Sequence, residues 1–336
     1  MSACSSLVII VKDGDSRIVQ FSHFSVKEFL TANRLAEPIR DISRHHIRLE
    51  SAHTILAQSC LGVLLRLDDH VDRDSIKNFP LALYAARYWA MHARFENALS
   101  RIKDGMERLF DADKPHFATW LWIYDQDRGG RSMFTMRPEK PEAVPLYYAA
   151  MLGFRDMAEH LIAKHPEHIN ARGGTESTLM HVAASEGHAE ILTLLLEHGA
   201  DVDDWDRGHT ALHRALFNAK AEAGRCLLDH GADINARFHD DWTPLILAAV
   251  LGRVEFARML LECGARINVQ ENSSARTPLH FAVGNRSIQA MRLFLEYGAD
   301  VKAIDNSGFT PSQLASELGY HEIVELLSEY GAEPVK

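Results

Sequence analysis

The stretch Thr277-Pro278-Leu279-His280-Phe281-Ala282 decides how the chain is organised, because similar stretches recur at a fixed interval. Four apolar positions align at a spacing of 32 to 34 residues: Met180, Leu212, Leu245 and Leu279. The threonine two residues before each of them and a later glycine keep the same spacing: Thr178, Thr210, Thr243 and Thr277, then Gly199, Gly231, Gly264 and Gly298. A period of this length predicts small units that stack on one another.

Each unit reads as two short helices. Pro278 fits the first position of a helix, where its missing N–H is not needed, and Thr277 fits the N-cap. A second helix follows, with Ile191, Leu194 and Leu195 at helical spacing in one unit. It ends before Gly199, which can take the left-handed conformation that terminates helices. One such pair cannot bury its own apolar face, so the pairs must stack into a solenoid.

This pattern resembles the ankyrin repeat, and six units can be counted. The first, around residues 144–150, has lost the threonine and the histidine, and we expect it to face the preceding domain. The last replaces the Leu-His pair by Ser312-Gln313 and ends in several glutamates, as a solvent-facing terminal cap should. The resemblance implies a mainly α-helical solenoid that binds another protein through hairpin tips and the first helix of each unit, which form a concave face.

Composition places the chain among soluble globular proteins. It has 336 residues, of which 46% are hydrophobic and 24% charged. The longest apolar run, residues 55–67, is too short for a membrane span, and residues 1–11 lack the basic start of a secretory signal. Four scattered cysteines fit a reducing compartment. We therefore expect a cytoplasmic protein with no membrane partner.

Charge is distributed unevenly. The net charge is −10, but residues 138–336 hold 17 Lys or Arg against 29 Asp or Glu, so the repeats are acidic. An acidic array repels a phosphate backbone, which argues against nucleic acid as a partner.

The N-terminal segment suggests a second resemblance. Residues 6–22 predict a β-hairpin with an Asp13-Gly14 turn, and Ser25 with Glu28 forms a capping box before a helix. The run from Phe21 to Ala32 is similar to the Phe-x-His-x-Ser-x-x-Glu-Phe pattern in the winged helix of NACHT-type signalling ATPases, above all fungal ones with ankyrin repeats. The resemblance implies that His23 contacts the β-phosphate of ADP; a structural role at the helix entry is the alternative.

The family's P-loop is absent from this sequence, so we expect no ATP hydrolysis by this chain and no cofactor. The predicted domains are a winged-helix remnant (1–39), a helical domain (40–137) and the repeats (138–336). The main functional hypothesis is a non-catalytic scaffold that binds a protein. The alternative is the regulatory and sensor portion of a NACHT-type ATPase whose nucleotide-binding domain is missing from this chain.

Residues 40–137 predict packing helices without a repeat. One covers Ile55 to Leu65 and is apolar almost all round, and another opens at Pro80. A third has a stripe that begins at Leu99, and a fourth follows Pro115.

Nineteen histidines raise the question of a metal site. His181, His213 and His280 occupy the repeat slot where an imidazole bonds to the neighbouring loop, so we favour a structural role and expect no metal. His321-Glu322 lacks the second histidine of a zinc-protease helix, and Ser100 with Lys103 has no companion catalytic motif. We therefore expect no enzyme activity.

The candidate binding residues lie on hairpin tips and at the ends of first helices. Val250 and Leu251 stand where another unit has the polar pair Ser185-Glu186, and exposed apolar residues there would mark a contact site. The alternative is that they fold inward against a neighbouring unit. The full set of predicted protein-binding residues is Trp205, Arg207, Phe217, Phe238, His239, Val250 and Leu251.

Overall fold

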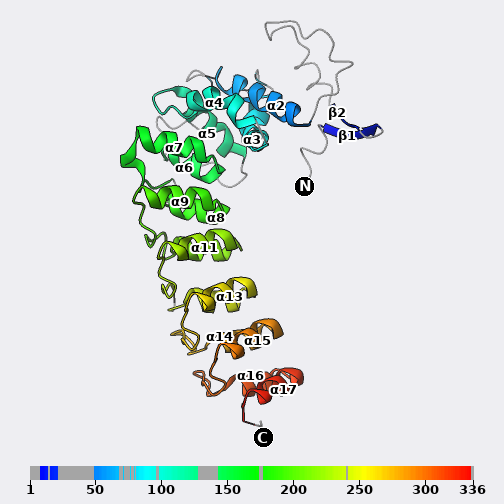
Figure 1. Ribbon diagram of the computed structural model, residues 1–336, viewed down its shortest axis with the longest axis vertical. Coiled ribbons are helices and arrows are strands. Elements are labelled where there is room, and N and C mark those ends of the chain that lie inside the picture. The colour runs from blue at the N-terminus through cyan, green and yellow to red at the C-terminus, as the bar shows by residue number, and fades with distance from the viewer. Residues whose placement is uncertain are drawn as a thin grey trace. The chain divides into compact units, whose positions relative to one another are not determined.

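The computed structural model describes residues 8–13, 16–21, 49–67, 71, 76, 79, 81–95, 98–127, 143–173, 177–239 and 241–333. The chain forms two compact units, Met1–Pro141 and Glu142–Lys336. The second unit contains the repeats (Figure 1).

The first unit begins with the predicted hairpin. Strands β1 (Val8–Asp13) and β2 (Ser16–Phe21) pair antiparallel, from Val8 opposite Phe21 to Asp13 opposite Ser16. His23 and the helix expected behind Ser25 lie outside the described residues, so the winged-helix resemblance stays a prediction.

Four helices complete the described part of this unit: α2 (Leu49–Leu64), α3 (Ala82–Ala93), α4 (Ala98–Leu109) and α5 (Pro115–Asp127). Their core is aromatic. Trp89 and Trp120 meet edge to face with ring centroids 5.7 Å apart, and Trp120 Nε1 donates to the Ala86 carbonyl at 3.0 Å. Helix α2 packs against both α3 and α4.

Two details of these helices differ from the expectation. Ile55 is 43% exposed, so α2 is not buried all round. Ala98, not Leu99, begins the buried stripe of α4: Ala98 is 0% exposed, whereas Leu99 is 36% exposed at the edge of the stripe. Near the start of α2, His53 Nδ1 lies 2.8 Å from His92 Nδ1.

The second unit consists of six helix pairs, as the repeat pattern predicts (Figure 1). The pairs are α6 (Pro145–Leu152) with α7 (Arg155–Lys164), α8 (Leu179–Glu186) with α9 (Ala189–Glu197), α10 (Ala211–Phe217) with α11 (Ala221–Asp229), α12 (Pro244–Val250) with α13 (Val254–Glu262), α14 (Pro278–Gly284) with α15 (Ile288–Glu296), and α16 (Pro311–Glu317) with α17 (His321–Glu329). A short 3₁₀ turn, η3 (Pro166–His168), follows α7.

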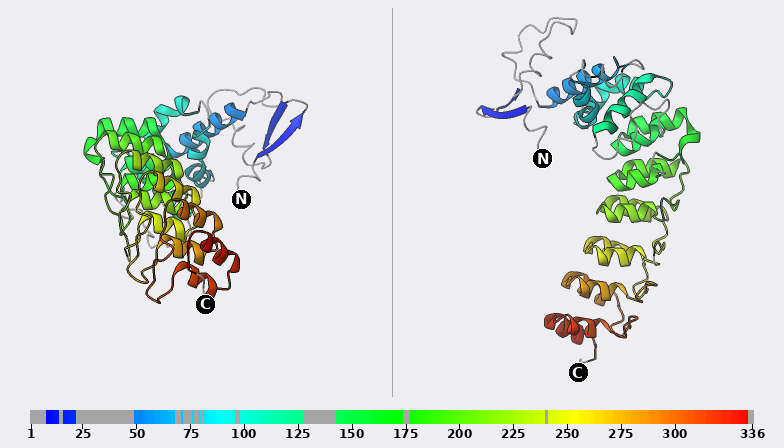
Figure 2. Two further views of the ribbon diagram at one scale, coloured as in Figure 1. Left: turned by 60° about the horizontal axis from the view of Figure 1, so that its bottom comes forward. Right: turned by 180° about the vertical axis from the view of Figure 1, so that it is seen from behind.

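The pairs stack in two rows. First helices pack on first helices from α6 to α16, and second helices pack on second helices from α7 to α15. We call these the first-helix row and the second-helix row. Between successive pairs, the connecting hairpins follow one another along one edge of the stack (Figures 1 and 2).

Helix capping follows the sequence signals. The hydroxyls of Thr178, Thr243 and Thr310 accept hydrogen bonds from the third helical residue. Gly199 has a φ of 84°, in the left-handed region that ends the second helix.

The aligned apolar residues form a buried strip through the stack: Leu146, Met180, Leu212, Leu245 and Leu279 are each at most 2% exposed. In the last unit Ser312 occupies this position and is also buried, at 1%. The terminal cap is therefore solvent-facing on α17, where Glu322, Glu325 and Glu329 are exposed, but not at Ser312. Stacking of α16 on α14 covers that position.

None of the helices in the described part of the chain has the length and apolar character that a membrane crossing needs.

Candidate functional site

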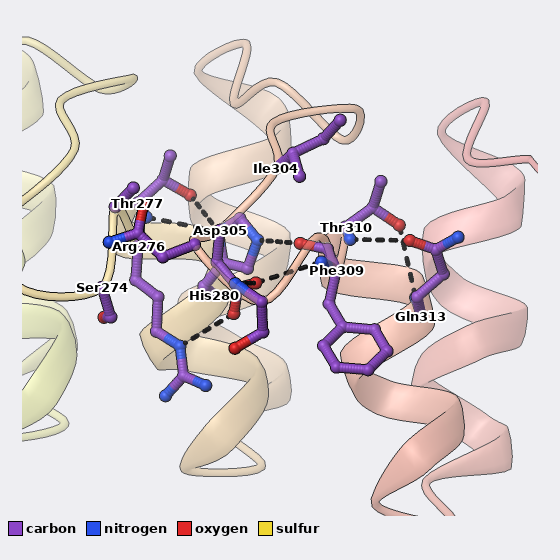
Figure 3. Close-up of polar contacts among 12 residues, drawn as sticks. Ser274, Arg276, Thr277, His280, Ile304, Asp305, Phe309, Thr310 and Gln313 are labelled. Atoms are coloured by element: carbon purple, nitrogen blue, oxygen red, sulfur yellow. Dashed lines mark hydrogen bonds and ion pairs between the residues drawn. The ribbon is translucent and has the colours of Figure 1, made fainter.

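At two junctions between repeats, a histidine of one repeat hydrogen-bonds to the next hairpin. His280 Nε2 donates to the Phe309 carbonyl of the next hairpin at 3.1 Å, and the Thr277 N–H donates to His280 Nδ1 at 3.2 Å (Figure 3). His181 Nε2 likewise donates to the His209 carbonyl at 2.9 Å. The predicted loop-to-loop bond is therefore present for these two histidines. Burial lowers the pKa of both imidazoles, which keeps them neutral.

Buried acidic residues at the start of the hairpins form a second link. Asp305 accepts from Arg276 Nε of the preceding unit at 3.2 Å and from the N–H of Ser307 at 2.9 Å (Figure 3). Asp206 accepts in the same way from Ser177 of the unit before it. Burial alone would raise the pKa of each carboxyl, but these hydrogen bonds and the adjacent arginines outweigh it and lower the pKa.

The junction between the third and fourth units lacks both links. Phe238 pairs with Trp242 across its hairpin as Asp206 pairs with His209, so it takes the position of the acidic residue. Its ring is 9% exposed and meets the rings of His209 and His213 at centroid distances of 5.0 and 4.7 Å. We call the ring set His209, His213, Phe217, Phe238, His239 and Trp242 the aromatic cluster.

Polar atoms inside this cluster are left without partners. His213 Nε2, His209 Nδ1 and Trp242 Nε1 are buried and make no hydrogen bond within the described residues. Burial, together with nearby His209, lowers the pKa of His213 to about 3, so this imidazole is neutral. The Ala236 backbone of the next hairpin acts to raise this pKa, but His213 Nε2 has no acceptor within hydrogen-bond geometry in the described structure, unlike His181 and His280.

Beside the cluster lies a depression of about 270 Å³, which we call the arginine pocket. Its polar lining comes from three units: Tyr147, Ser177, His181, Ser185, Arg207 and Arg214.

The third hairpin positions one side of the arginine pocket. Asp206 and His209 exchange two backbone hydrogen bonds of 2.9 Å, which leaves Arg207 and Gly208 as a two-residue turn. Their φ angles are 48° and 79°, as a type I′ turn requires. Arg207 therefore occupies a conformation that favours Gly or Asn, and its side chain is exposed.

Helix α10 supplies the other side. Arg214 Nη2 donates to Asp206 Oδ2 at 2.8 Å, and Ser177 Oγ donates to the same oxygen at 2.5 Å. The Asp206 carboxylate is fully buried and holds an arginine whose side chain is 30% exposed. The pocket thus presents the guanidinium of Arg214, fixed by Asp206, together with the Arg207 guanidinium, which has no ion pair among the described residues.

A comparison with protein families explains the repeat. The family model described as ankyrin repeats (3 copies) matches residues 146–238, 204–271 and 269–336. The chain belongs to the ankyrin-repeat family.

Curated relatives share this part of the chain. Azaphilone pigments biosynthesis cluster protein L from Monascus ruber is 34% identical over 216 residues, covering 59% of this chain and 45% of that protein. The human palmitoyltransferase ZDHHC13 is 37% identical over 194 residues, covering 57% of this chain and 31% of that protein. The likeness to the palmitoyltransferase is to its ankyrin region only. The chain spans less than half the length of these relatives.

Solved structures of ankyrin repeat domains are similar to this chain. The ankyrin repeat domain of Bcl-3, from the IkappaB protein family, is 30% identical with a TM-score of 0.54, covering 56% of this chain and 87% of that one. An ankyrin repeat domain from Acinetobacter baumannii is 33% identical with a TM-score of 0.52, covering 56% and 98%. Ankyrin repeats imply a protein-interaction module.

The predicted binding residues of this ankyrin array fall into three groups. Trp205 (42% exposed), Arg207 and His239 are exposed on hairpins. Phe217 and Val250 are half-buried near the ends of α10 and α12, and Leu251 is 37% exposed. Phe238 is buried, so it supports the surface from below. The structure brings Phe217, Phe238 and His239 together around His209, while Val250 and Leu251 belong to the next unit.

Sequence reasoning missed Arg214. The signal was present in the repeat alignment, because the position after the histidine slot holds Tyr148, Val182, Leu247, Phe281 and Leu314 in the other five repeats. A single arginine among apolar residues marks a position that serves something other than packing.

One group of described residues has metal-ligand geometry. His165 Nδ1 lies 3.2 Å and His168 Nε2 3.9 Å from Glu167 Oε1, after α7 in the first repeat. This exposed turn is separate from the arginine pocket and the aromatic cluster.

Proposed function

We propose that this chain is a non-catalytic scaffold that binds a polypeptide along the first-helix row and the adjoining hairpins, the concave face of ankyrin arrays. The observation behind the proposal is a difference in charge between the two rows. The six first helices together contain one arginine and two glutamates. The six second helices contain five Lys or Arg and twelve Asp or Glu.

This difference supports a contact role for the first-helix row. A row that is solvated needs charged residues, whereas the centre of a protein interface is depleted in them. Large apolar side chains are also exposed on this side. Trp205 and Ile304 lie on hairpins, and Leu251 and Leu318 directly follow first helices. Such residues supply much of the binding energy when a partner covers them.

The surface is suited to an extended or helical segment more than to a small molecule. The arginine pocket is open to solvent and has a volume of only about 270 Å³. Small-molecule sites are usually concave and bury most of the ligand.

The test selects ligands from a random library, so the natural partner need not be identified first. Random 16-residue peptides displayed on phage are enriched on the immobilised full chain, and the affinity of the enriched peptides is measured by fluorescence anisotropy. Replacing both Val250 and Leu251 by Ser should weaken binding by tenfold or more. The change should cost only about 1 kcal/mol of stability because Leu251 is already 37% exposed.

Tyr297→Ser is the matched control, since Tyr297 is 41% exposed and follows the second helix α15. The Tyr297→Ser variant should bind the peptides with the same affinity as the unchanged chain. The proposal is wrong if the peptides bind the Val250/Leu251 variant normally, or if Tyr297→Ser is the change that abolishes binding. If the double variant unfolds, the peptide affinity of the single variant Leu251→Ser tests the proposal instead.

A further inference from the structure

We propose that the arginine pocket receives the carboxylate of an Asp or Glu side chain from the bound polypeptide. The inference rests on the proposed function and adds the chemistry of one partner residue. It is carried by a geometric arrangement of Arg207, Arg214 and Asp206 that no other hairpin of the described repeats reproduces.

Arg214 departs from the packing rule of the array. The position of Arg214 lies on the first helix of its repeat. In each of the other five repeats an apolar or aromatic side chain occupies it. An arginine loses that packing and retains a charge on a row that otherwise contains two glutamates. Its planar guanidinium can bind a carboxylate through two parallel hydrogen bonds.

Asp206 keeps Arg214 in place. The carboxylate is fully buried, and both Arg214 Nη2 and Ser177 Oγ use its Oδ2 atom. Its Oδ1 atom is buried with no hydrogen-bond partner in the described structure, and the same holds for Arg214 Nε. Buried polar atoms of native proteins are nearly always satisfied, by ordered water or a ligand where the chain itself supplies no partner. A support that fixes the guanidinium lowers the entropy lost when a ligand binds.

Arg207 makes the pocket net positive. No carboxylate of the described residues lies within ion-pair distance of its guanidinium, whereas Arg214 is compensated by Asp206. Among the described residues of the pocket, two arginines and one aspartate leave one positive charge. Arg207 also keeps a φ of 48°, a conformation that costs free energy for a residue with a Cβ. Strain of this kind is common at binding sites.

The anion must arrive as part of a polypeptide. The repeats as a whole are strongly acidic, with most of the charge on the second-helix row, so a small free anion is repelled at long range. A segment that gains apolar contacts along the first-helix row can bring one carboxylate close to the two guanidiniums. The exposed large apolar residues nearest in the repeat order are Trp205 on the third hairpin and Leu251 in the fourth repeat.

Geometry predicts the spacing of the recognition pattern. Neighbouring helices pack about 8–10 Å apart, and an extended chain advances about 3.3 Å per residue. In a peptide that crosses from the third to the fourth repeat, the acidic residue and the apolar residue that meets Leu251 should therefore lie about three positions apart.

The experiment uses the phage-selected peptides and the full chain. Enriched sequences should share an Asp or Glu about three residues from an apolar residue. Arg207→Gln should weaken their binding about tenfold, and replacing the peptide acid by its amide should weaken it by a similar factor. The two changes together should cost little more than either alone, because they remove the same interaction. Arg258→Gln, an exposed arginine on α13, is the matched control and should change nothing.

Arg214→Gln should weaken binding by a similar factor, but it also leaves Asp206 without its ion pair. If the Arg214→Gln variant unfolds, the test of the proposal is the effect of Arg207→Gln on binding. Arg214→Lys should recover part of the affinity, since an ammonium lacks the two-pronged geometry.

The outcomes separate the two proposals. This inference is overturned, and the proposed function left intact, if the peptides depend on Leu251 but show no preference for an acidic residue. The same holds if the effects of Arg207→Gln and of the amide peptide on affinity simply add. Peptides that ignore Leu251, or a library from which none is enriched, overturn the proposed function and with it this inference. A phosphoserine in place of the acid that binds more than tenfold tighter would assign the pocket to a phosphoryl group.

Discussion

At the histidine slot and the acidic hairpin position, the fifth and sixth repeats are joined by polar contacts, whereas the third and fourth are joined by rings. In the first, Arg276 reaches Asp305 and His280 reaches a backbone carbonyl (Figure 3). In the second, Phe238 replaces the acidic residue, and His209 and His213 pack on it. The same backbone thus accepts either solution, provided that each hairpin covers the next.

This difference also separates stability from binding. At the polar junction the described structure leaves one buried polar atom, Ser312 Oγ, without a hydrogen bond, whereas the aromatic junction and the arginine pocket together leave five. Unpaired buried groups destabilise a fold, so their concentration in the third and fourth repeats favours this region as the functional part of the array.

The largest expected effect comes from removing the ring at the aromatic junction. Phe238→Ala should lower the free energy of unfolding by about 3–4 kcal/mol, because the ring is 9% exposed and fills the space between two imidazoles. Urea unfolding measures this change in the free energy of unfolding. Ile304→Ala, in the sixth hairpin and 56% exposed, should stay within about 0.5 kcal/mol. Equal effects of the two changes would contradict the packing role of Phe238.

Mild acid should loosen the aromatic junction first. Burial lowers the pKa of His213 to about 3 from an ordinary value of 6.5, so the unfolded chain binds more protons below pH 6.5. Stability is full above that pH and falls as the pH drops toward 3, by about 2 kcal/mol at pH 5.

His213→Gln should flatten this dependence between pH 7 and 5, since Gln313 fills the same slot in the sixth repeat and caps its helix. Urea unfolding at several pH values tests it, with the exposed His230→Gln as control. An unchanged slope in His213→Gln would show that another group titrates.

The stability of the polar junction should depend on the charge of Asp305. Asp305→Asn keeps an oxygen for the N–H groups of Ser307 and Phe309 but loses the oxygen that pairs with Arg276, at a cost of about 1–2 kcal/mol at pH 7. Because the folded pKa of Asp305 is lowered, the contribution of the carboxylate is present above its unfolded pKa and is lost as the pH falls through its folded pKa.

The variant and the unchanged chain should therefore converge in strong acid. Thermal unfolding at pH 7 and pH 3 gives the comparison, and a difference that persists undiminished at pH 3 would contradict the ion-pair role.

The smallest effect concerns the turn inside the third repeat. Ala219 has a φ of 55° where the second and fourth repeats place Gly187 and Gly252. Ala219→Gly should therefore stabilise the array by about 0.5–1 kcal/mol, measured by urea unfolding. Gly187→Ala is the reverse control and should destabilise it, because its Cβ would meet the Lys220 side chain at 2.8 Å. A destabilised Ala219→Gly would show that the turn tolerates alanine without strain.

The repeat architecture could be predicted because its signals are local. A threonine that caps a helix, a proline that opens one and a glycine that ends one act within a few residues. The alignment of Met180, Leu212 and Leu279 then identified the buried strip, since helical periodicity places such residues on one face. The binding residues were identified less completely: Trp205 and Leu251 are exposed as expected, but Phe238 is buried and Arg214 was missed.

By itself, the sequence determined the number of helix pairs, their capping and the residues of their shared core, because these depend on spacing along the chain. Only the tertiary structure decided that Phe238 stands where its neighbours have a carboxylate, and that Ser177, Asp206 and Arg214 meet. It also decided that Ile55 and Leu99 face outward. Those facts depend on which side of each element a neighbour covers, and contacts between residues about thirty positions apart are fixed when the repeats stack.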